Sequence, residues 1–193
     1  MSNMRMNLSS LSLSLLLTGA LSAPAFSAAP LTPAGQVIAA GPVTAGGPVT
    51  PAALTTLPAL ALPDLDGKAH DSKEWAGKVV VVDFWATWCT GCRETIPVLK
   101  RLQEKYGAKG LVVAGVTTDK GPKEKVAKFV KKMKMTYQVL WDADDTQSKV
   151  FGFEGLPSVF VFGRDGKLLK AMPQYTAARE KEMEALVEGQ FAK

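Results

Sequence analysis

The sequence predicts a single α/β domain with a mixed central β-sheet flanked by helices. Two observations carry this prediction. Apolar, β-branched segments alternate with segments of helical periodicity, and the series ends in a hairpin signal followed by an amphipathic segment. The chain has 193 residues, of which 47% are hydrophobic, and this is enough for one domain with a hydrophobic core.

The first elements of this domain, which we expect to span residues 58–193, lead up to a pair of cysteines. Residues 62–69 predict two short strands around an Asp-Gly turn. Residues 79–85 form a β-branched and aromatic run that is typical of a strand buried on both faces. A helix should follow Cys92, because apolar residues recur on one face at Ile96, Leu99, Leu102 and Tyr106.

The remaining elements continue the alternation of strands and helices. We expect a strand at 111–117, a lysine-rich helix within 120–134, a strand at 138–141, a short helical segment near 147–151 and a strand at 158–162. The Asp-Gly pair within residues 164–167 predicts a hairpin turn, with 168–172 as the returning strand. Thr176 is expected to cap a last amphipathic helix.

The first 57 residues differ in composition from the rest. After Arg5, no Asp, Glu, Lys or Arg occurs before Asp64. Residues 1–25 are predicted to be a signal peptide, with a Leu/Ser-rich apolar stretch and a small-residue cleavage site at 23–25. An uncleaved membrane anchor is the alternative, although the apolar run is shorter than the ~20 residues of a spanning helix. Residues 26–57, rich in Ala, Pro, Gly and Thr, predict a flexible linker.

The export signal indicates a periplasmic or otherwise extracytoplasmic protein that is soluble after cleavage. The net charge of +5 comes largely from the lysines of residues 120–134. We interpret these lysines as the solvated face of a helix, with an acidic protein partner as the alternative. Nucleic acid is not expected as a partner of an exported chain.

The chain has two cysteines, Cys89 and Cys92. A disulfide between them would close a very small loop and constrain the unfolded chain little, so the bond suits reversible opening better than structural stapling. The pair lies where a buried strand ends and a helix begins, and a helix N-terminus favours an anion. We therefore expect Cys89 to attack as a thiolate and Cys92 to resolve the mixed disulfide.

Other uses of the pair fit the sequence less well. A zinc site needs four ligands, and beside the two cysteines the chain offers a single histidine, His70. Covalent haem attachment needs a histidine where Arg93 stands. We expect no metal and no cofactor other than the redox-active disulfide itself. An inert structural disulfide remains the alternative.

Two segments are distinctive when taken together: Val-Val-Asp-Phe-Trp-Ala-Thr-Trp-Cys-Thr-Gly-Cys at 81–92 and Gly-Leu-Pro-Ser at 155–158. They strongly resemble the active-site segment and the cis-proline loop of thioredoxins. The hairpin at 62–68 and the insert between Asp119 and Phe151 look like the TlpA/ResA branch. The resemblance covers roughly residues 58–190. It implies a thioredoxin fold with an N-terminal β-hairpin and a central helix–strand insert.

The resemblance also implies roles for single residues. Pro157 would be the cis-proline that faces the cysteines, and the backbone of Leu156 would pair with an extended substrate segment. Trp88 would flank the cysteines in the docking surface, with core packing as the alternative. Asp83 matches a buried carboxylate that should have a raised pKa and accept the proton of Cys92. The alternative interpretation of Asp83 is a carboxylate at a strand end that faces water.

Three positions depart from the patterns of the family. Gly91 stands where proline is common, Thr95 where TlpA/ResA-like members often have glutamate, and Gly115 where thioredoxins have the lysine that accompanies the buried aspartate. Glycine loosens the turn between the cysteines. Without that lysine, Asp83 should have a higher pKa than its counterpart in thioredoxins.

The TlpA/ResA branch holds extracytoplasmic thiol–disulfide oxidoreductases, often reductants in cytochrome c or copper-site maturation. The resemblance thus implies an exported monomeric enzyme that reduces disulfides of client proteins and is itself reduced by a membrane-linked thiol donor. Two alternatives stay open: an oxidase or isomerase of client disulfides, and a non-catalytic thioredoxin-fold binding module. The reduction potential separates the first from the reductase.

Overall fold

The computed structural model describes residues 54–192, which build a five-stranded sheet in the order β5-β4-β3-β6-β7. Strands β3 (Val79–Trp85), β4 (Leu111–Thr117) and β5 (Gln138–Trp141) are parallel. Strands β6 (Ser158–Phe162) and β7 (Leu168–Pro173) complete the sheet with antiparallel pairing. The predicted mixed sheet and its order of strands and helices are confirmed.

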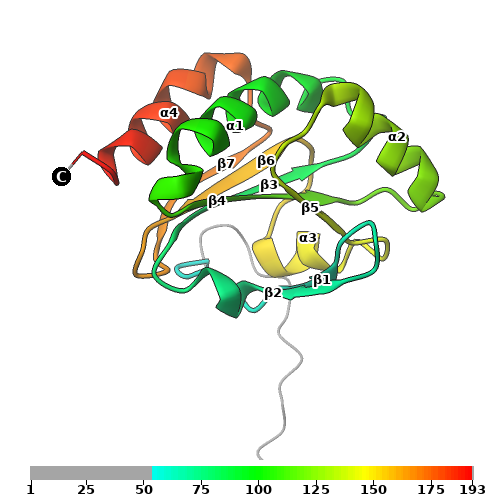
Figure 1. Cartoon of the computed structure of the whole chain (residues 1–193), viewed down its shortest axis with the longest axis horizontal. Coiled ribbons are helices and arrows are strands. Elements are labelled where there is room, and N and C mark those ends of the chain that lie inside the picture. Colours follow the sequence, from blue (N-terminus) through cyan, green and yellow to red (C-terminus); the bar gives the residue numbers. More distant parts are fainter. Residues whose placement is uncertain (1–53, 193) are drawn as a thin grey trace, which may run out of the picture. The chain divides into compact units, whose positions relative to one another are not determined.

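Helices cover both faces of this sheet (Figure 1). On one face lie α1 (Cys92–Tyr106), α2 (Lys123–Met133) and α4 (Glu180–Gly189). On the other lie α3 (Thr146–Phe151) and the small hairpin of β1 (Ala61–Pro63) and β2 (Ala69–Asp71). Short 3₁₀ turns occupy Ser72–Trp75, Gly107–Lys109 and Ala177–Arg179. The predicted insert between Asp119 and Phe151 contains α2, β5 and α3, which follow β4 and precede β6.

Strand β3 is the centre of the core, because all seven of its residues are buried. Its alternate side chains point to opposite faces of the sheet. Val80, Val82 and Phe84 pack in the core on the α3 side, where Phe84 meets the ring of Phe151 at 4.8 Å. Val79 and Val81 pack in the core beneath α1 and α4. Each large apolar side chain buried in this way contributes about 1.5–3 kcal/mol relative to an exposed one.

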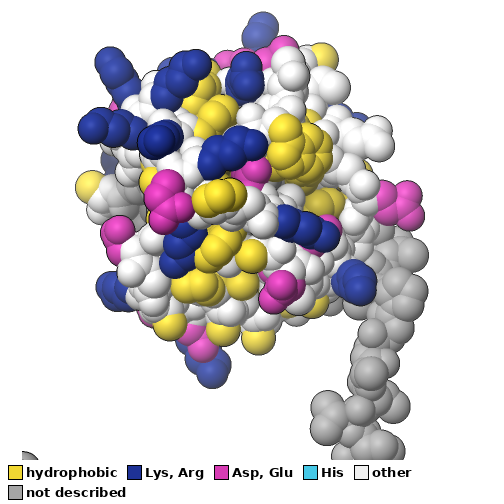
Figure 2. Space-filling model, turned by 90° about the vertical axis from the view of Figure 1, so that its right-hand side faces the viewer, with side chains coloured by type: hydrophobic (Ala, Val, Ile, Leu, Met, Phe, Trp, Pro, Cys, Tyr) yellow, Lys and Arg dark blue, Asp and Glu magenta, His cyan; other side chains and the backbone are white. Residues whose placement is uncertain are grey.

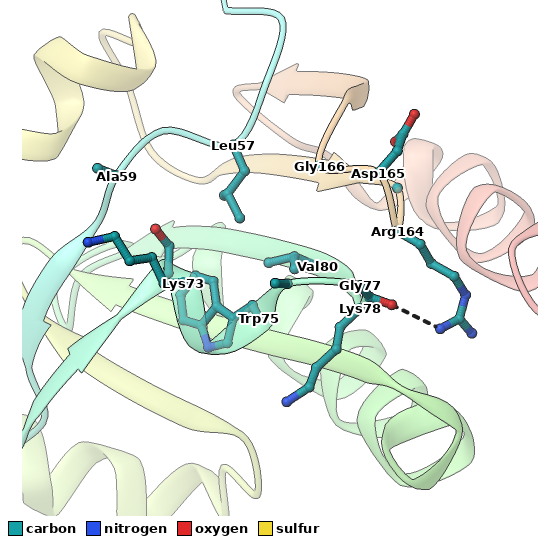
Figure 3. A pocket seen from close by; sticks show the side chains of 13 residues that line it. Leu57, Ala59, Lys73, Trp75, Gly77, Lys78, Val80, Arg164, Asp165 and Gly166 are labelled. Atoms are coloured by element: carbon teal, nitrogen blue, oxygen red, sulfur yellow. Dashed lines mark hydrogen bonds between the residues drawn. The ribbon is translucent and has the colours of Figure 1, made fainter.

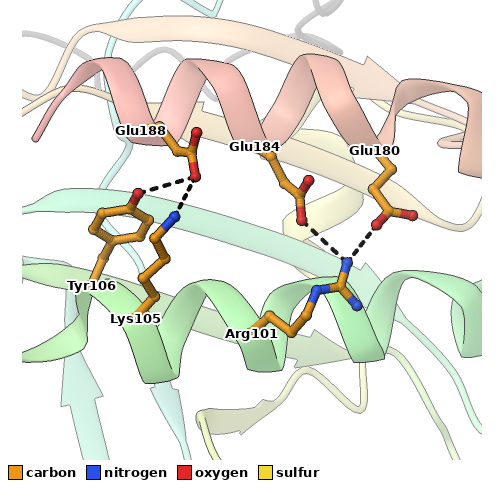
Figure 4. A network of polar contacts seen from close by, with 6 residues as sticks. All are labelled: Arg101, Lys105, Tyr106, Glu180, Glu184 and Glu188. Carbon is orange, nitrogen blue, oxygen red and sulfur yellow. Dashed lines mark hydrogen bonds and ion pairs between the residues drawn. The ribbon is translucent and has the colours of Figure 1, made fainter. Parts of the chain in front are cut away.

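Helices α1 and α4 are also joined by polar contacts along their length (Figure 4). Arg101 of α1 binds both Glu180 and Glu184 of α4, the latter at 3.1 Å. One turn further on, Glu188 accepts from the Lys105 ammonium at 2.6 Å and from the Tyr106 hydroxyl at 3.1 Å. Solvent-exposed ion pairs add little stability each, so the contacts fix the register of the two helices more than they stabilise them.

The structure differs from the sequence prediction at two ends of the domain. Leu57 donates a backbone hydrogen bond to Gly166 (2.8 Å), so residues 54–57 of the predicted linker pack on the β6–β7 turn. The prediction that Thr176 caps the last helix is wrong. A 3₁₀ turn separates Thr176 from α4, and its hydroxyl makes no capping hydrogen bond. The predicted signal peptide and linker residues 26–53 lie outside the described residues.

Gly115 of β4 should tolerate no larger residue. It pairs with Asp83, and a Cβ atom there would lie 2.9 Å from Tyr137 Cε2 and 3.0 Å from Trp85 Nε1. Both rings are buried and cannot move away, so we expect Gly115→Ala to lower the free energy of unfolding by about 1–3 kcal/mol. Denaturant unfolding measures this. The matched control is Gly121→Ala, at an exposed position with open space around it. Equal stability of the two variants would contradict the close packing at Gly115.

Candidate functional site

Cys89 and Cys92 form a disulfide at the carboxyl end of the parallel strands, where β3 gives way to α1. The Cα atoms of the two cysteines are 5.4 Å apart. Cys89 keeps 6% of its surface exposed, whereas Cys92 is fully buried. Of the two cysteines, only Cys89 therefore keeps any surface exposed. This asymmetry agrees with the predicted division between an attacking and a resolving thiol.

The N-terminus of α1 acts directly on the sulfur of Cys89. The backbone N–H of Cys92, the first residue of α1, donates to Cys89 Sγ at 3.2 Å. Unpaired N–H groups and the helix dipole make this end of a helix favourable for an anion. After reduction, a thiolate at Cys89 would be stabilised by the same group, and the thiolate is the nucleophile in disulfide exchange.

The loop before Cys89 is held by the buried carboxylate of Asp119. Its two oxygens accept the Thr87 backbone N–H (2.8 Å) and the Thr87 hydroxyl (2.7 Å). Thr117, at the end of β4, donates a third hydrogen bond at 2.8 Å. The sequence analysis missed this role of Asp119. The available signal was a Thr-Thr-Asp at the end of an apolar strand, which gives no hint that the partner is 32 residues away.

Pro157 faces the turn between the two cysteines. The Leu156–Pro157 peptide bond is cis, as the resemblance implies. A Cβ atom on Gly91 would lie 3.4 Å from Pro157 Cδ, so the ring packs directly on that turn. The carbonyl of Pro157 accepts from Tyr175 N–H (2.8 Å), but the N–H and C=O of Leu156 bond to no backbone group in residues 54–192. The loop thus presents a free backbone edge beside the disulfide.

Trp88 lies at the surface next to the disulfide. It is 66% exposed, so the alternative of core packing does not hold. The side chain forms part of a cleft of about 420 Å³ whose lining also includes Thr118, Asp145, Ser148 and residues 153–156. Figure 2 shows this end of the molecule, where hydrophobic side chains come to the surface among basic and acidic ones. The predicted substrate residues Trp88 and Leu156 therefore line one cleft.

Asp83 is completely buried on β3, so its placement at a water-facing strand end does not hold. Burial raises the pKa of Asp83 from 3.8 to about 7, and nearby Thr95 acts in the opposite direction. Neither carboxylate oxygen has a hydrogen-bond partner among the described residues. The Thr95 hydroxyl instead donates to the carbonyl of Cys92 at 2.8 Å. Thr95 therefore links the surroundings of the buried carboxylate to the resolving cysteine.

The strand position beside Asp83 is Gly115, so this neighbour supplies no cation. The space next to Gly115 is filled by the rings of Trp85 and Tyr137. Burial, together with the charge of Asp83, raises the pKa of Tyr137 well above its usual value. Asp83 therefore shares an apolar pocket with uncharged rings, which explains why its neutral form is favoured.

Within 54–192, no group of three or more His, Cys, Asp or Glu side chains could hold a metal ion. A cleft of about 480 Å³ opens at the other end of β3, where Arg164 donates to the carbonyl of Gly77 at 3.3 Å (Figure 3). None of the predicted site residues lines it. None of the helices in 54–192 combines the length and hydropathy that a membrane crossing requires.

Comparisons with known proteins agree with this geometry. The Redoxin family model matches residues 52–187. Thiol-disulfide oxidoreductase ResA of Geobacillus thermodenitrificans is 31% identical over 116 residues, which are 60% of this chain and 66% of the relative. The chain thus spans just under two thirds of this relative's length.

Solved structures give the same result. A candidate thiol:disulfide interchange protein DsbE from Chlorobium tepidum has a TM-score of 0.66 and 30% identity, covering 70% of this chain and 94% of its own. A candidate protein disulfide isomerase from Bacteroides thetaiotaomicron has a TM-score of 0.60 and 28% identity, covering 69% and 84%. The chain therefore belongs to the Redoxin family, as a TlpA/ResA-like member of the thioredoxin superfamily.

Proposed function

We propose that the protein is an extracytoplasmic thiol–disulfide oxidoreductase that reduces disulfides of client proteins. One observation carries the proposal: a Cys89–Cys92 disulfide at the N-terminus of α1 in which Cys89, but not Cys92, keeps some surface exposed. The likeness to proteins named thiol-disulfide oxidoreductase ResA supports the activity. Export of this chain, and clients in cytochrome c or copper-site maturation, are further parts of the proposal that follow from the TlpA/ResA branch.

The proposed cycle starts from the reduced protein. The Cys89 thiolate attacks one sulfur of a client disulfide; the client S–S bond breaks, and the other client sulfur leaves as a thiolate that takes a proton from water. Cys92 then loses its proton and attacks Cys89 Sγ, which releases the second client sulfur and forms the Cys89–Cys92 disulfide. Two electrons pass to the client in total. A thiol donor linked to the membrane then returns two electrons to the pair, which restores the thiolate of Cys89 and, with one proton, the thiol of Cys92.

Asp83 is proposed as the group that takes the proton of Cys92. A base works best when its pKa lies near the working pH, and burial raises the pKa of Asp83 to about 7. Thr95 lies near Asp83 and donates a hydrogen bond to the carbonyl of Cys92, which supports proton transfer between Cys92 and Asp83. The buried position of Cys92 leaves bulk water little access, so an internal acceptor is needed.

The reverse direction is the second candidate. The candidate protein disulfide isomerase from Bacteroides thetaiotaomicron, which is 28% identical to this chain, favours this direction. We expect a reduction potential near or below about −270 mV, the value of thioredoxin, because a reductant must give electrons to its client. Equilibration of the pair with a glutathione or dithiothreitol buffer measures it. A potential near about −120 mV would instead assign the protein to oxidation.

Replacing Cys92 by serine should trap client proteins. The mixed disulfide at Cys89 then persists, because no second thiol is placed to attack it. Non-reducing electrophoresis of extracts that contain Cys92→Ser should show complexes that disappear on reduction. Cys89→Ser is the matched control and should trap none, since Cys92 is buried. A failure of Cys92→Ser to form any complex would favour a non-catalytic binding module.

Asp83→Asn should change the pH dependence of stability. The folded protein keeps the Asp83 proton up to a pH of about 7, whereas the unfolded chain loses it near 3.8. Rising pH between these values therefore favours unfolding, and the stability lost is on the order of 4 kcal/mol. The asparagine variant lacks this loss and should be the more stable protein above pH 7. Denaturant unfolding of the oxidised proteins from pH 4 to 8 measures the difference.

Activity provides the second readout of the same variant. If Asp83 accepts the proton, Asp83→Asn should slow release of the client from the mixed disulfide while leaving its formation at Cys89 less affected. The control is Asp144→Asn, at an exposed aspartate, which should alter neither the stability profile nor the release step. Parallel stability profiles for Asp83→Asn and the unmodified protein would argue against the raised pKa.

A further inference from the structure

We propose that the cleft beside Trp88 selects client segments that carry a basic side chain next to the reacting cysteine. This inference rests on the proposed function and names the class of substrate that the function acts on. The occupant is an extended peptide segment of a client protein. Its recognition would combine three features of the cleft: a free backbone edge, an exposed aromatic wall and an uncompensated negative charge.

The backbone edge lies at Leu156. Its N–H and C=O bond to no backbone group in residues 54–192, and Leu156 lines the cleft. An extended peptide can hydrogen-bond to such an edge in the manner of an added strand. Because Pro157 packs on Gly91, between the two cysteines, a segment bound along this edge passes close to Cys89. The cleft therefore receives the residues that flank the client cysteine.

Trp88 forms the aromatic wall of the cleft. Among the described residues, Trp88 and Leu169 are the large hydrophobic side chains that stay exposed, and Leu169 does not line this cleft. Exposure of a tryptophan costs free energy in water, which a bound segment would recover by covering the ring. Hydrogen bonds from Thr87 to Asp119 hold the loop that carries Trp88, so the wall is preformed.

The charge comes from Asp145 and Glu154, which are the ionisable side chains of the lining. Neither carboxylate forms an ion pair within residues 54–192, and no lysine or arginine lines the cleft. The backbone of Asp145 is fixed by hydrogen bonds from its N–H to Asp142 (3.1 Å) and from Ser148 Oγ to its carbonyl (3.0 Å). Two carboxylates in a partly enclosed cleft attract a cationic side chain and repel an acidic one.

This local charge opposes the charge of the whole chain. The net charge of +5 should draw acidic peptides toward the protein at long range. The cleft instead predicts a preference for basic peptides at the disulfide itself. The two effects therefore have opposite signs, and a preference for basic peptides cannot arise from the net charge.

The test uses two disulfide-bridged peptides that differ only in a lysine or a glutamate beside the cysteine. Protein that has been reduced and freed of reductant is mixed with each peptide, and the second-order rate of Cys89–Cys92 disulfide formation is measured. We expect the lysine peptide to react faster by about threefold or more at low ionic strength, with the ratio falling as salt screens the charges. Glu154→Gln and Asp145→Asn should each lower the ratio, and the double variant should lower it most.

The matched control is Glu104→Gln, which changes the net charge equally at an exposed position on α1 and should leave the ratio unchanged. Equal rates for the two peptides, or a faster glutamate peptide, would overturn the inference and keep the proposed function. An equal fall of the ratio in Glu104→Gln would also overturn it. A protein whose reduced cysteines react with neither peptide nor with a small aromatic disulfide would overturn both.

Discussion

The pairing of β3 with β4 is the constraint on which the rest of the structure depends. The two strands are parallel and in register over their whole length, from Val79 opposite Leu111 to Trp85 opposite Thr117. Parallel strands end at the same edge of a sheet, so the loops that follow them lie side by side. The loop after β3 carries Thr87 and the cysteines, and the loop after β4 carries Asp119. The hydrogen bonds between Thr87 and Asp119 are a direct consequence of this register.

At Asp83, on the same strand β3, the stability of the fold and the proposed reactivity of the site make opposite demands. This position faces the interior beneath α1, where an apolar side chain would pack without electrostatic cost. A carboxylate there has no hydrogen-bond partner among the described residues and is neutral up to a pH of about 7. Structure alone gives no reason to keep such a group. Its cost becomes understandable if the protein needs a proton acceptor near a resolving thiol that water cannot reach.

Features encoded within a few residues were predictable from the sequence, and features that depend on distant contacts were not. The strand at 79–85 and the Cys89–Cys92 pair are local patterns, and both lie where they were expected. The Asp119 contact joins residues 32 positions apart, and the cleft brings Trp88 next to residues 145 and 154. No periodicity or spacing reports such contacts. The prediction that Thr176 caps the last helix was wrong for a different reason, because a 3₁₀ turn stands where the first turn of that helix was expected.

The surroundings of the two sulfurs also bear on the direction of electron flow. Whatever stabilises a Cys89 thiolate stabilises the reduced protein and makes the pair more oxidising. In residues 54–192, one N–H group donates to Cys89 Sγ, and the group buried near the resolving cysteine is a carboxylate rather than a cation. A neighbouring carboxylate disfavours a thiolate wherever it ionises. The N–H group at the start of α1 and the carboxylate buried near Cys92 therefore act in opposite directions on the stability of the reduced pair, and the balance between them sets its reduction potential.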